Sequence, residues 1–239
     1  TLLRAEKYDA VIDAQGLIKS AVLVTKQANG VKYGYDKYSA REGLSSWFYD
    51  KTFNISYQQH AVARIRQLFA KALDYTLPEE IGYYGIAQHF VKNRENSTAY
   101  VVMIHATTRA DKHWPETQWA DLIRSTTALG LRVHLPWGNE QEKARAERLA
   151  KLSADVVVLP KMSLTELASE IANAKAVVSV DTGLSHLTAA LDKPNIILYG
   201  ATDPKLIGAY GKNQHYLTGN NMESILPYRV WQGLEALFE

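Results

Sequence analysis

The sequence predicts an α/β protein with two lobes, a first one that contains a βαβ unit and a second one built on a doubly wound parallel sheet. Between residues 99 and 199, short apolar segments of strand length alternate regularly with segments of helical periodicity. The apolar segments are continuous, which is typical of parallel strands covered by helices on both faces. The 239 residues exceed the roughly 150 of an average domain but fall short of two domains. The length therefore allows between one and two domains.

The first lobe is predicted from a βαβ pattern and one long helix. Residues 8–13 read as a strand, the residues after Gly16 as a helix that ends at Gly30, and residues 31–35 as a second strand. A helix over residues 56–75 closes this lobe, because apolar residues recur there at helical spacing; they are Val62, Ile65, Phe69 and Leu73.

A polar stretch at residues 92–98 is the expected linker, which assigns residues 1–93 to the first lobe and residues 94–239 to the second. In the second lobe, strands and helices are expected to alternate, as in a doubly wound sheet. The expected strands span 99–105, 131–135, 156–159, 176–180 and 195–199, and the expected helices 115–129, 140–152, 164–173 and 184–191.

Composition excludes several classes of protein. The chain has no cysteine, which excludes disulfide frameworks, thiolate zinc sites and cysteine nucleophiles. The formal charge is only +2, which disfavours a general nucleic-acid binder, so we expect no nucleic-acid partner. Neither a signal peptide nor an apolar run near the ~18 residues of a membrane span is visible, so any membrane contact is expected to be peripheral.

The basic excess lies entirely in the first 60 residues, which hold eight basic and six acidic residues, whereas the rest of the chain holds 19 of each. An ordinary solvated surface explains this distribution, and so does an edge that faces an anionic ligand or a membrane. The sequence leaves both explanations open.

The ends of the predicted strands carry the candidate binding residues, because ligands of doubly wound sheets bind beyond the carboxyl ends of the strands. After the first strand of the second lobe come Thr107, Thr108 and Lys112, followed by Pro115 at the start of a helix. Two hydroxyls, a lysine and free helical N–H groups would form an anion pocket. The alternative is that the threonines shape a turn and the lysine is solvated.

A second candidate lies at residues 181–186. Thr182 and Gly183 would present N–H groups at the positive end of a helix dipole, where a phosphate is stabilised. Asp181 is either the N-cap of this helix or an acceptor for ligand hydroxyls. We expect His186, inside the helix, to be a packed residue or a hydrogen-bond donor and not a metal ligand, because no second ligand stands at a metal-site spacing.

Two glutamates are explained by helix capping. Asn139 and Ser163 each precede a glutamate by three residues, the spacing of a capping box, which accounts for Glu142 and Glu166 without a ligand. Glu142 could also hold a ribose diol, and Met162 could line the slot of a flat base. The motifs of dinucleotide oxidoreductases, P-loop proteins, zincins and α/β-hydrolases do not occur, which leaves a diphosphate site without a glycine-rich loop.

Five stretches in order along the chain resemble the lipopolysaccharide heptosyltransferases of glycosyltransferase family 9. They are residues 8–16 (YDAVIDAQG), 105–109 with 112–115 (HATTR and KHWP), 135–138 (LPWG), 159–164 (LPKMSL) and 178–187 (VSVDTGLSHL). The resemblance covers essentially the whole chain and implies the GT-B fold, with two Rossmann-like lobes, each a doubly wound parallel sheet. It also implies that the first lobe is incomplete in these 239 residues.

The resemblance implies inverting transfer of L-glycero-D-manno-heptose from ADP-heptose to the Kdo of a lipid A-linked core, with no cofactor and no obligatory metal. ADP is then a product, and the enzyme would be cytoplasmic and peripheral on the inner membrane. By position, Lys112 and Asp181 would be catalytic. The donor-binding residues would be Thr107, Thr108, Lys112, Glu142, Met162, Asp181, Thr182, Gly183 and His186.

The resemblance assigns the acceptor side to the first lobe, with Asp13, Gln15 and Arg41 as candidates. Arg41 would pair with the Kdo carboxylate, which suits a bidentate guanidinium. The family's general base, an aspartate near the start of its first lobe, has no counterpart in these 239 residues, so we expect this polypeptide to bind ADP-sugar but to transfer little. A binding module without catalysis and a nucleotide-sugar epimerase of the same architecture remain as alternatives.

Overall fold

The computed structural model describes residues 2–91, 98–200 and 202–238, which form two compact units. The first unit holds the residues up to Glu80 together with 205–207, and the second holds the rest of the described chain. The expected linker and the expected boundary after residue 93 involve residues 92–97, which lie outside the described residues, so both stay predictions.

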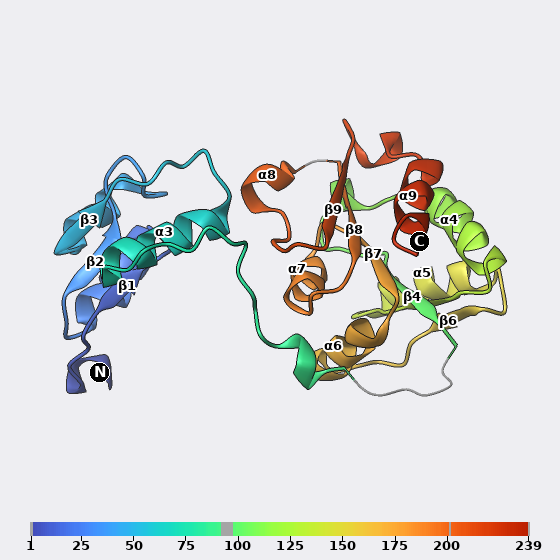
Figure 1. Cartoon of the computed structure of the whole chain (residues 1–239), viewed down its shortest axis with the longest axis horizontal. Helices are drawn as coiled ribbons and strands as arrows, with labels where there is room; N and C mark the ends of the chain where they lie inside the picture. Colours follow the sequence, from blue (N-terminus) through green and yellow to red (C-terminus); the bar gives the residue numbers. More distant parts are fainter. Residues whose placement is uncertain (1, 92–97, 201, 239) are drawn as a thin grey trace. The chain divides into compact units, whose positions relative to one another are not determined.

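The first unit contains a parallel sheet of three strands in the order β1-β2-β3 (Figure 1). Val11 pairs with Lys32, and Tyr33 pairs with Lys51. The predicted βαβ unit is therefore present, but its helix ends early and continues as a 3-10 turn. The elements are α1 (Leu2–Ala5), β1 (Val11–Asp13), α2 (Ile18–Leu23), η1 (Thr25–Gln27), β2 (Lys32–Tyr35), η2 (Gly43–Phe48), β3 (Lys51–Phe53) and α3 (Ala61–Leu73).

Helix α3 confirms the predicted long helix, although it buries a different face. Its one fully buried large side chain is Leu68, which packs with Tyr35 and Ile55. Ile65, Phe69 and Leu73, from the expected apolar stripe, are between 36% and 51% exposed. The spacing of apolar residues therefore identified the helix but not the side that contacts the core.

The second unit contains six parallel strands in the order β6-β5-β4-β7-β8-β9 (Figure 1). This is the 3-2-1-4-5-6 order of the dinucleotide-binding doubly wound fold, whose strand order reverses between β4 and β7. The strands are β4 (Tyr100–Ile104), β5 (Arg132–Leu135), β6 (Val156–Val158), β7 (Ala176–Val180), β8 (Asn195–Tyr199) and β9 (Gln214–Thr218). The reversal places the loops after β4 and β7 side by side, at the edge where such folds bind ligands.

Every element expected between residues 99 and 199 is present, within three residues at each end. The helices are α4 (Glu116–Ala128), α5 (Glu140–Ala150), α6 (Leu164–Asn173) and α7 (Gly183–Ala190), followed by α8 (Pro204–Ile207) and α9 (Pro227–Glu235). β9 and α9 were not predicted. β9 has no fully buried residue, so its sequence lacks the apolar run by which the other strands were recognised.

The core of the second unit lies in two layers, one on each face of the sheet. Val101 and Met103 of β4 pack with Trp119 of α4 on one face, whereas Val102 and Ile104 pack with Ile171 of α6 on the other. Alternate residues of a strand point to opposite faces, so a continuous apolar strand supplies both layers. No helix within the described ranges is long and apolar enough to cross a bilayer.

We predict that Gly16→Ala destabilises the first unit. Gly16 has φ +62°, and a Cβ there would lie 3.2 Å from Arg41 N and 3.3 Å from Ala40 Cα. A left-handed alanine alone costs about 1–2 kcal/mol, and the close backbone adds to that cost. Urea unfolding measures the loss. Gly130→Ala is the matched control, because Gly130 has φ +74° but open space around it; an equal or smaller loss for Gly16→Ala would contradict the steric explanation.

Candidate functional site

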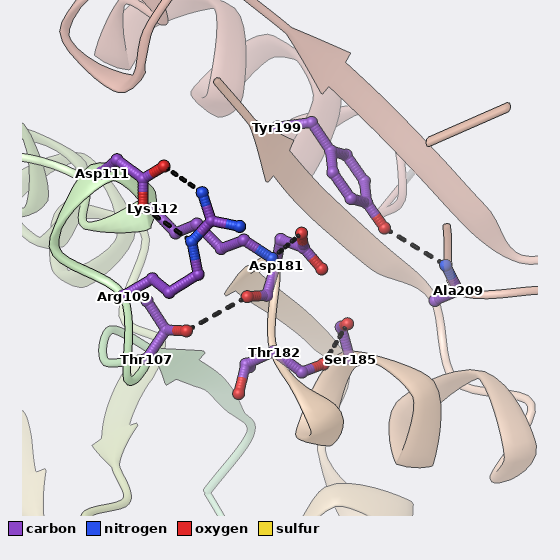
Figure 2. Close-up of polar contacts among 9 residues, drawn as sticks. All are labelled: Thr107, Arg109, Asp111, Lys112, Asp181, Thr182, Ser185, Tyr199 and Ala209. Atoms are coloured by element: carbon purple, nitrogen blue, oxygen red, sulfur yellow. Dashed lines mark hydrogen bonds and ion pairs between the residues drawn. The ribbon is translucent and has the colours of Figure 1, made fainter. Parts of the chain in front are cut away.

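The candidate site lies where β4 and β7 end. The β4 loop, residues 105–115, follows β4, and the turn at Asp181 and Thr182 joins β7 to α7. Thr107 Oγ1 donates a hydrogen bond to the backbone oxygen of Asp181 at 3.2 Å (Figure 2). The two segments, which are more than 70 residues apart in sequence, are therefore joined directly at the strand-order reversal.

Lys112 and Asp181 form an ion pair at the centre of this site. Lys112 Nζ lies 2.6 Å from Asp181 Oδ2, and the two side chains are only 16% and 9% exposed (Figure 2). Removing either partner would leave the other charge nearly buried and uncompensated. The pair holds a lysine ammonium at the end of the sheet, in the position expected of an anion-binding group.

The structure does not support the N-cap interpretation of Asp181, and its role as an acceptor for ligand hydroxyls stays a prediction. The N-cap of α7 is Thr182, one residue later, and Asp181 pairs with Lys112 instead. The Thr182 side chain makes no capping hydrogen bond, and a Cβ at Gly183 would meet nothing within 4 Å. Space is therefore open in front of a helix N-terminus whose N–H groups favour an anion. His186 lies within the same helix and is exposed.

A slot of about 290 Å³ runs beside these residues. Its polar side contains the hydroxyls of Thr107, Thr108 and Thr182, and Trp137 is held in its wall by a 2.6 Å hydrogen bond from Nε1 to Leu159 O. The apolar lining is Ile104, Ala106, Pro136, Trp137, Met162, Leu164, Leu167 and Leu184. An apolar slot with hydroxyls along one side suits a flat base joined to a polar group.

Glu142 lies at the capped start of α5 and also faces the slot, while its contact with a ribose stays a prediction. Asn139 Oδ1 accepts from Glu142 N at 3.0 Å, so Asn139 caps α5 as predicted. Glu142 Oε2 accepts from Gly138 N at 2.7 Å and not from the Asn139 backbone, which differs from the expected capping box. The capping box at Ser163 and Glu166 is complete. The Glu142 carboxylate also lines the slot, where its remaining lone pairs can accept from a ligand.

A wider cavity of about 560 Å³ adjoins the slot and shares Thr107, Thr108 and Glu142 with it. Its other charged side chains are Glu116, Arg145 and Arg148, none of which we selected from the sequence. A signal for the two arginines was present, because positions 142, 145 and 148 recur every three residues along α5 and so lie near one another on the helix surface.

The candidate acceptor residues lie in the first unit, Asp13 and Gln15 at the end of β1 and Arg41 in the segment after β2. Gln15 and Arg41 are exposed, and Gly16 links the two segments, because its carbonyl accepts from Glu42 N and a Cβ on it would lie 3.2 Å from Arg41 N. Asp13, by contrast, is 5% exposed and already accepts hydrogen bonds from its own unit. Its donors are the side chains of Ser20, Thr25 and Tyr49 and the backbone N–H groups of Gln15 and Gly16.

Asp13 thus has a structural role that the sequence did not suggest, and its assignment to the acceptor stays a prediction. The Asp13 charge also affects Tyr49: the pKa of this tyrosine is raised, chiefly by burial and in part by the nearby carboxylate. Among the residues that the structure describes, no three His, Asp or Glu side chains are grouped so that they could hold a metal ion.

The second unit has the strand order and the ligand edge of a Rossmann-like nucleotide-binding lobe. The chain belongs to glycosyltransferase family 9 (heptosyltransferase), whose sequence model matches residues 1–226. It is an α/β protein of the GT-B type, as predicted, and its class is that of the glycosyltransferases.

Two curated relatives show the extent of the similarity. The chain is 60% identical over 213 residues to lipopolysaccharide heptosyltransferase 1 of Escherichia coli K12, an alignment that covers 89% of this chain and 67% of that protein. It is 46% identical over 215 residues to the protein of the same name from Pseudomonas aeruginosa, which covers 90% of this chain and 61% of the relative.

Solved structures agree with this assignment. The E. coli heptosyltransferase WaaC with ADP is 54% identical and superposes with a TM-score of 0.92, covering 99% of this chain and 75% of WaaC. WaaC with ADP-2-deoxy-2-fluoro heptose gives a TM-score of 0.89 at the same identity, over 98% of this chain and 74% of WaaC.

We predict that His105 makes the second unit sensitive to acid. His105 is fully buried, and burial followed by the Arg145 charge lowers its pKa to about 4. The stabilising effect of the neutral ring is complete above the unfolded pKa of about 6.5 and is lost as the pH falls toward 4. At pH 5 the loss is about 2 kcal/mol in the free energy of unfolding.

Urea unfolding at pH 7.5 and pH 5.0 measures this loss, and His105→Phe is the variant that removes the titrating group. His215→Phe in β9 of the same unit is the control, because His215 is exposed. If His105→Phe shows the same change in stability between the two pH values as the unaltered protein, the assignment to His105 is wrong.

Proposed function

We propose that this chain binds ADP-heptose in its second unit and takes part in transfer of the heptose to the Kdo of a lipopolysaccharide inner core. The observation that carries the proposal is the buried Lys112–Asp181 pair beside an apolar slot, at the strand-order reversal of a Rossmann-like lobe. The similarity to lipopolysaccharide heptosyltransferase 1, and to a structure solved with ADP, supports this substrate.

The diphosphate of the donor would lie between Lys112 and the start of α7. Without donor, the ammonium of Lys112 is balanced by Asp181 at 2.6 Å. An arriving diphosphate brings more negative charge than Lys112 can balance alone, and the hydroxyls of Thr107 and Thr108 with the N–H groups at Thr182 and Gly183 supply further donors. The adenine would occupy the slot against Met162, and the ribose diol would face Glu142.

The proposed transfer inverts the anomeric centre. A hydroxyl of Kdo attacks the anomeric carbon of the heptose from the face opposite ADP, a new C–O bond forms, the bond to the ADP oxygen breaks, and the hydroxyl proton passes to a base. Negative charge grows on the departing ADP, where Lys112 and the oriented N–H groups stabilise it most in the transition state. In this proposal, Lys112 and the N–H groups stabilise the charge on ADP without a cofactor or a metal. Asp181 accepts hydrogen bonds from heptose hydroxyls.

On the acceptor side, we propose that Arg41 meets the Kdo carboxylate and that Gln15 contacts the sugar. Both side chains are exposed, Gln15 just after β1 and Arg41 in the segment that follows β2. A guanidinium can form two parallel hydrogen bonds with a carboxylate, which fixes the orientation of the acceptor as well as its position.

The donor proposal predicts a preference among nucleotides and a role for Lys112. In calorimetric titrations with ADP, UDP and GDP, ADP should bind most tightly, and Lys112→Ala should weaken it at least ~10-fold, roughly 1.4 kcal/mol, by removing a charge-assisted contact. Lys151→Ala, an exposed lysine at the end of α5, is the control.

Because Lys112→Ala leaves Asp181 unpaired, the Lys112→Ala/Asp181→Asn double variant is titrated as well, and its ADP affinity should be similarly reduced. A preference for UDP, or unchanged ADP affinity in both Lys112 variants, would count against the proposed donor.

We also propose a peripheral contact between the first unit and the cytoplasmic face of the inner membrane. Leu44 and Trp47 of η2 are 53% and 78% exposed, and Leu23, at the end of α2, is 61% exposed. Lys26 lies next to them, with Nζ 5.7 Å from the Phe48 ring centroid. Tryptophan and leucine flanked by lysine are typical of surfaces that insert at the headgroup level of anionic lipids.

Cosedimentation with vesicles tests this contact. The full chain should bind vesicles that contain anionic phosphatidylglycerol more tightly than neutral phosphatidylcholine vesicles, and Leu44→Ser/Trp47→Ser should weaken the binding about 10-fold by removing apolar insertion. Tyr228→Ser, which removes a 58% exposed aromatic side chain of the second unit, is the control. Equal binding by the double variant and the control would reject this surface.

A further inference from the structure

The β4 loop carries three of the proposed donor-binding residues but has little regular structure of its own. Its regular element is one 3-10 turn, η4 (Ala110–Lys112), closed by a 3.2 Å hydrogen bond from Lys112 N to Arg109 O. Arg109 and Asp111, in the middle of the loop, pair with each other and are about half exposed. The loop must therefore be positioned by neighbouring elements, because binding groups act only when held close to their working geometry.

Two sets of contacts hold the β4 loop, but neither connects it to α5. On the side of β7, Thr107 and Lys112 bind Asp181 (Figure 2), but these are groups that the donor itself would engage. At the end of the loop, Trp114 is fully buried and donates from Nε1 to Ile225 O at 2.8 Å, which fixes it to the segment before α9. Neither contact sets the distance between the loop and Glu142.

Arg145 connects the β4 loop to α5. Its Nη1 donates to the backbone oxygen of His105 at 3.2 Å and also bonds His113 Nδ1. His105 opens the loop, and His113 lies next to its anchored end. A guanidinium is always protonated and has no acceptor, so His113 Nδ1 must accept and the His113 proton must lie on Nε2.

Glu116 holds Arg145 in place. Its carboxylate accepts from Arg145 Nε at 3.2 Å, and from Arg148 Nε and Nη2 at 3.0 and 2.5 Å. Hydrogen bonds from Arg148, and then from Arg145, lower the pKa of Glu116 to about 2, so it is ionised at neutral pH. The Arg145 side chain is only 17% exposed, so it lies between α4 and α5 with its donors directed at the loop.

We propose that Arg145 is a positioning residue, which ties the β4 loop to α5 so that Lys112 and Glu142 meet the two ends of one nucleotide diphosphate at the correct spacing. Glu142 and Arg145 are three residues apart on α5, so a shift of the helix moves both together. Arg145 lines the wider cavity and not the slot, which places it behind the binding groups. This inference rests on the proposed donor.

His113 makes the link dependent on pH, because a protonated ring cannot accept from Arg145. Arg145 faces it from α5 and, after burial, is the main cause that lowers the pKa of His113. Glu142, also on α5, and the Thr107 backbone oppose this shift. The other charged or titratable groups around His113 are Glu116 of α4, Arg148 of α5 and the buried His105. His113 is therefore neutral at pH 7, and acid is expected to release the loop from α5.

Titration of the full chain with ADP and with adenosine tests the proposal. Arg145→Ala should weaken ADP about 10-fold, as for a lost charged hydrogen bond, but change adenosine less than about 2-fold, because the phosphate-binding loop moves and the slot does not. Arg145→Lys, which has one donor nitrogen in place of three, should fall between. Arg124→Ala, which breaks an exposed ion pair with Asp121 on α4, is the matched control.

A second variant gives a readout that a purely structural role would not move. In His113→Asn, the side-chain oxygen can accept from Arg145 but cannot be protonated in this range. Its ADP affinity should stay within about 2-fold of the unaltered protein at pH 7.5 and should fall less on acidification to pH 5.5. Phosphate ionisation affects both proteins equally and cancels in the comparison.

The outcomes distinguish a wrong role for Arg145 from a wrong donor. If the unaltered chain does not prefer ADP, the proposed donor is wrong. If it prefers ADP, three results would overturn the role of Arg145: unchanged ADP affinity in Arg145→Ala, an equal loss of ADP and adenosine, or the same acid dependence in His113→Asn as in the unaltered chain. Should Arg145→Ala fail to fold, the Arg145→Lys and His113→Asn titrations still decide.

Discussion

The buried ion pair between Lys112 and Asp181 is the interaction on which the proposed donor site depends. It joins the loop after β4 to the turn after β7, and with the bond from Thr107 to Asp181 it brings two strand ends into one site. Burying two charges is favourable only when each balances the other. The same pair leaves an ammonium and a carboxylate next to an uncapped helix N-terminus, which an anionic ligand with hydroxyls can use.

The surroundings of this pair are built in layers. Most of the groups that would hold the diphosphate lie on the β4 loop and the turn after β7, and the groups behind them lie on helices: Glu116 on α4 and Arg145 on α5. Loops can approach a ligand closely but position side chains poorly, whereas packed helices hold their side chains well. Because Glu116 and Arg145 lie on packed helices, they can hold the β4 loop more rigidly than its own hydrogen bonds do.

Local pattern predicted the second unit well because its strands are buried on both faces. β7 and β8 are buried at every position, and a continuous apolar run is hard to mistake. β9, an edge strand without a fully buried residue, and β3, a strand of three residues with two exposed, carry no such run and were not predicted. In α3 the periodicity identified a helix, but Leu68, outside the expected stripe, faces the core, because packing partners and not spacing select the buried side.

The sequence by itself determined the alternation of strands and helices, the family, and the residues that follow each strand, because these depend on neighbours in the chain. Tertiary structure alone decided what those residues do: that Asp181 pairs with Lys112 and does not cap α7, that Asp13 is occupied by its own unit, and that Arg145 reaches both His105 and His113. The physical reason is distance along the chain. The bonds of Lys112 to Asp181, of Tyr49 to Asp13 and of Arg145 to the two histidines join residues between 32 and 69 positions apart. They form only once the chain has folded.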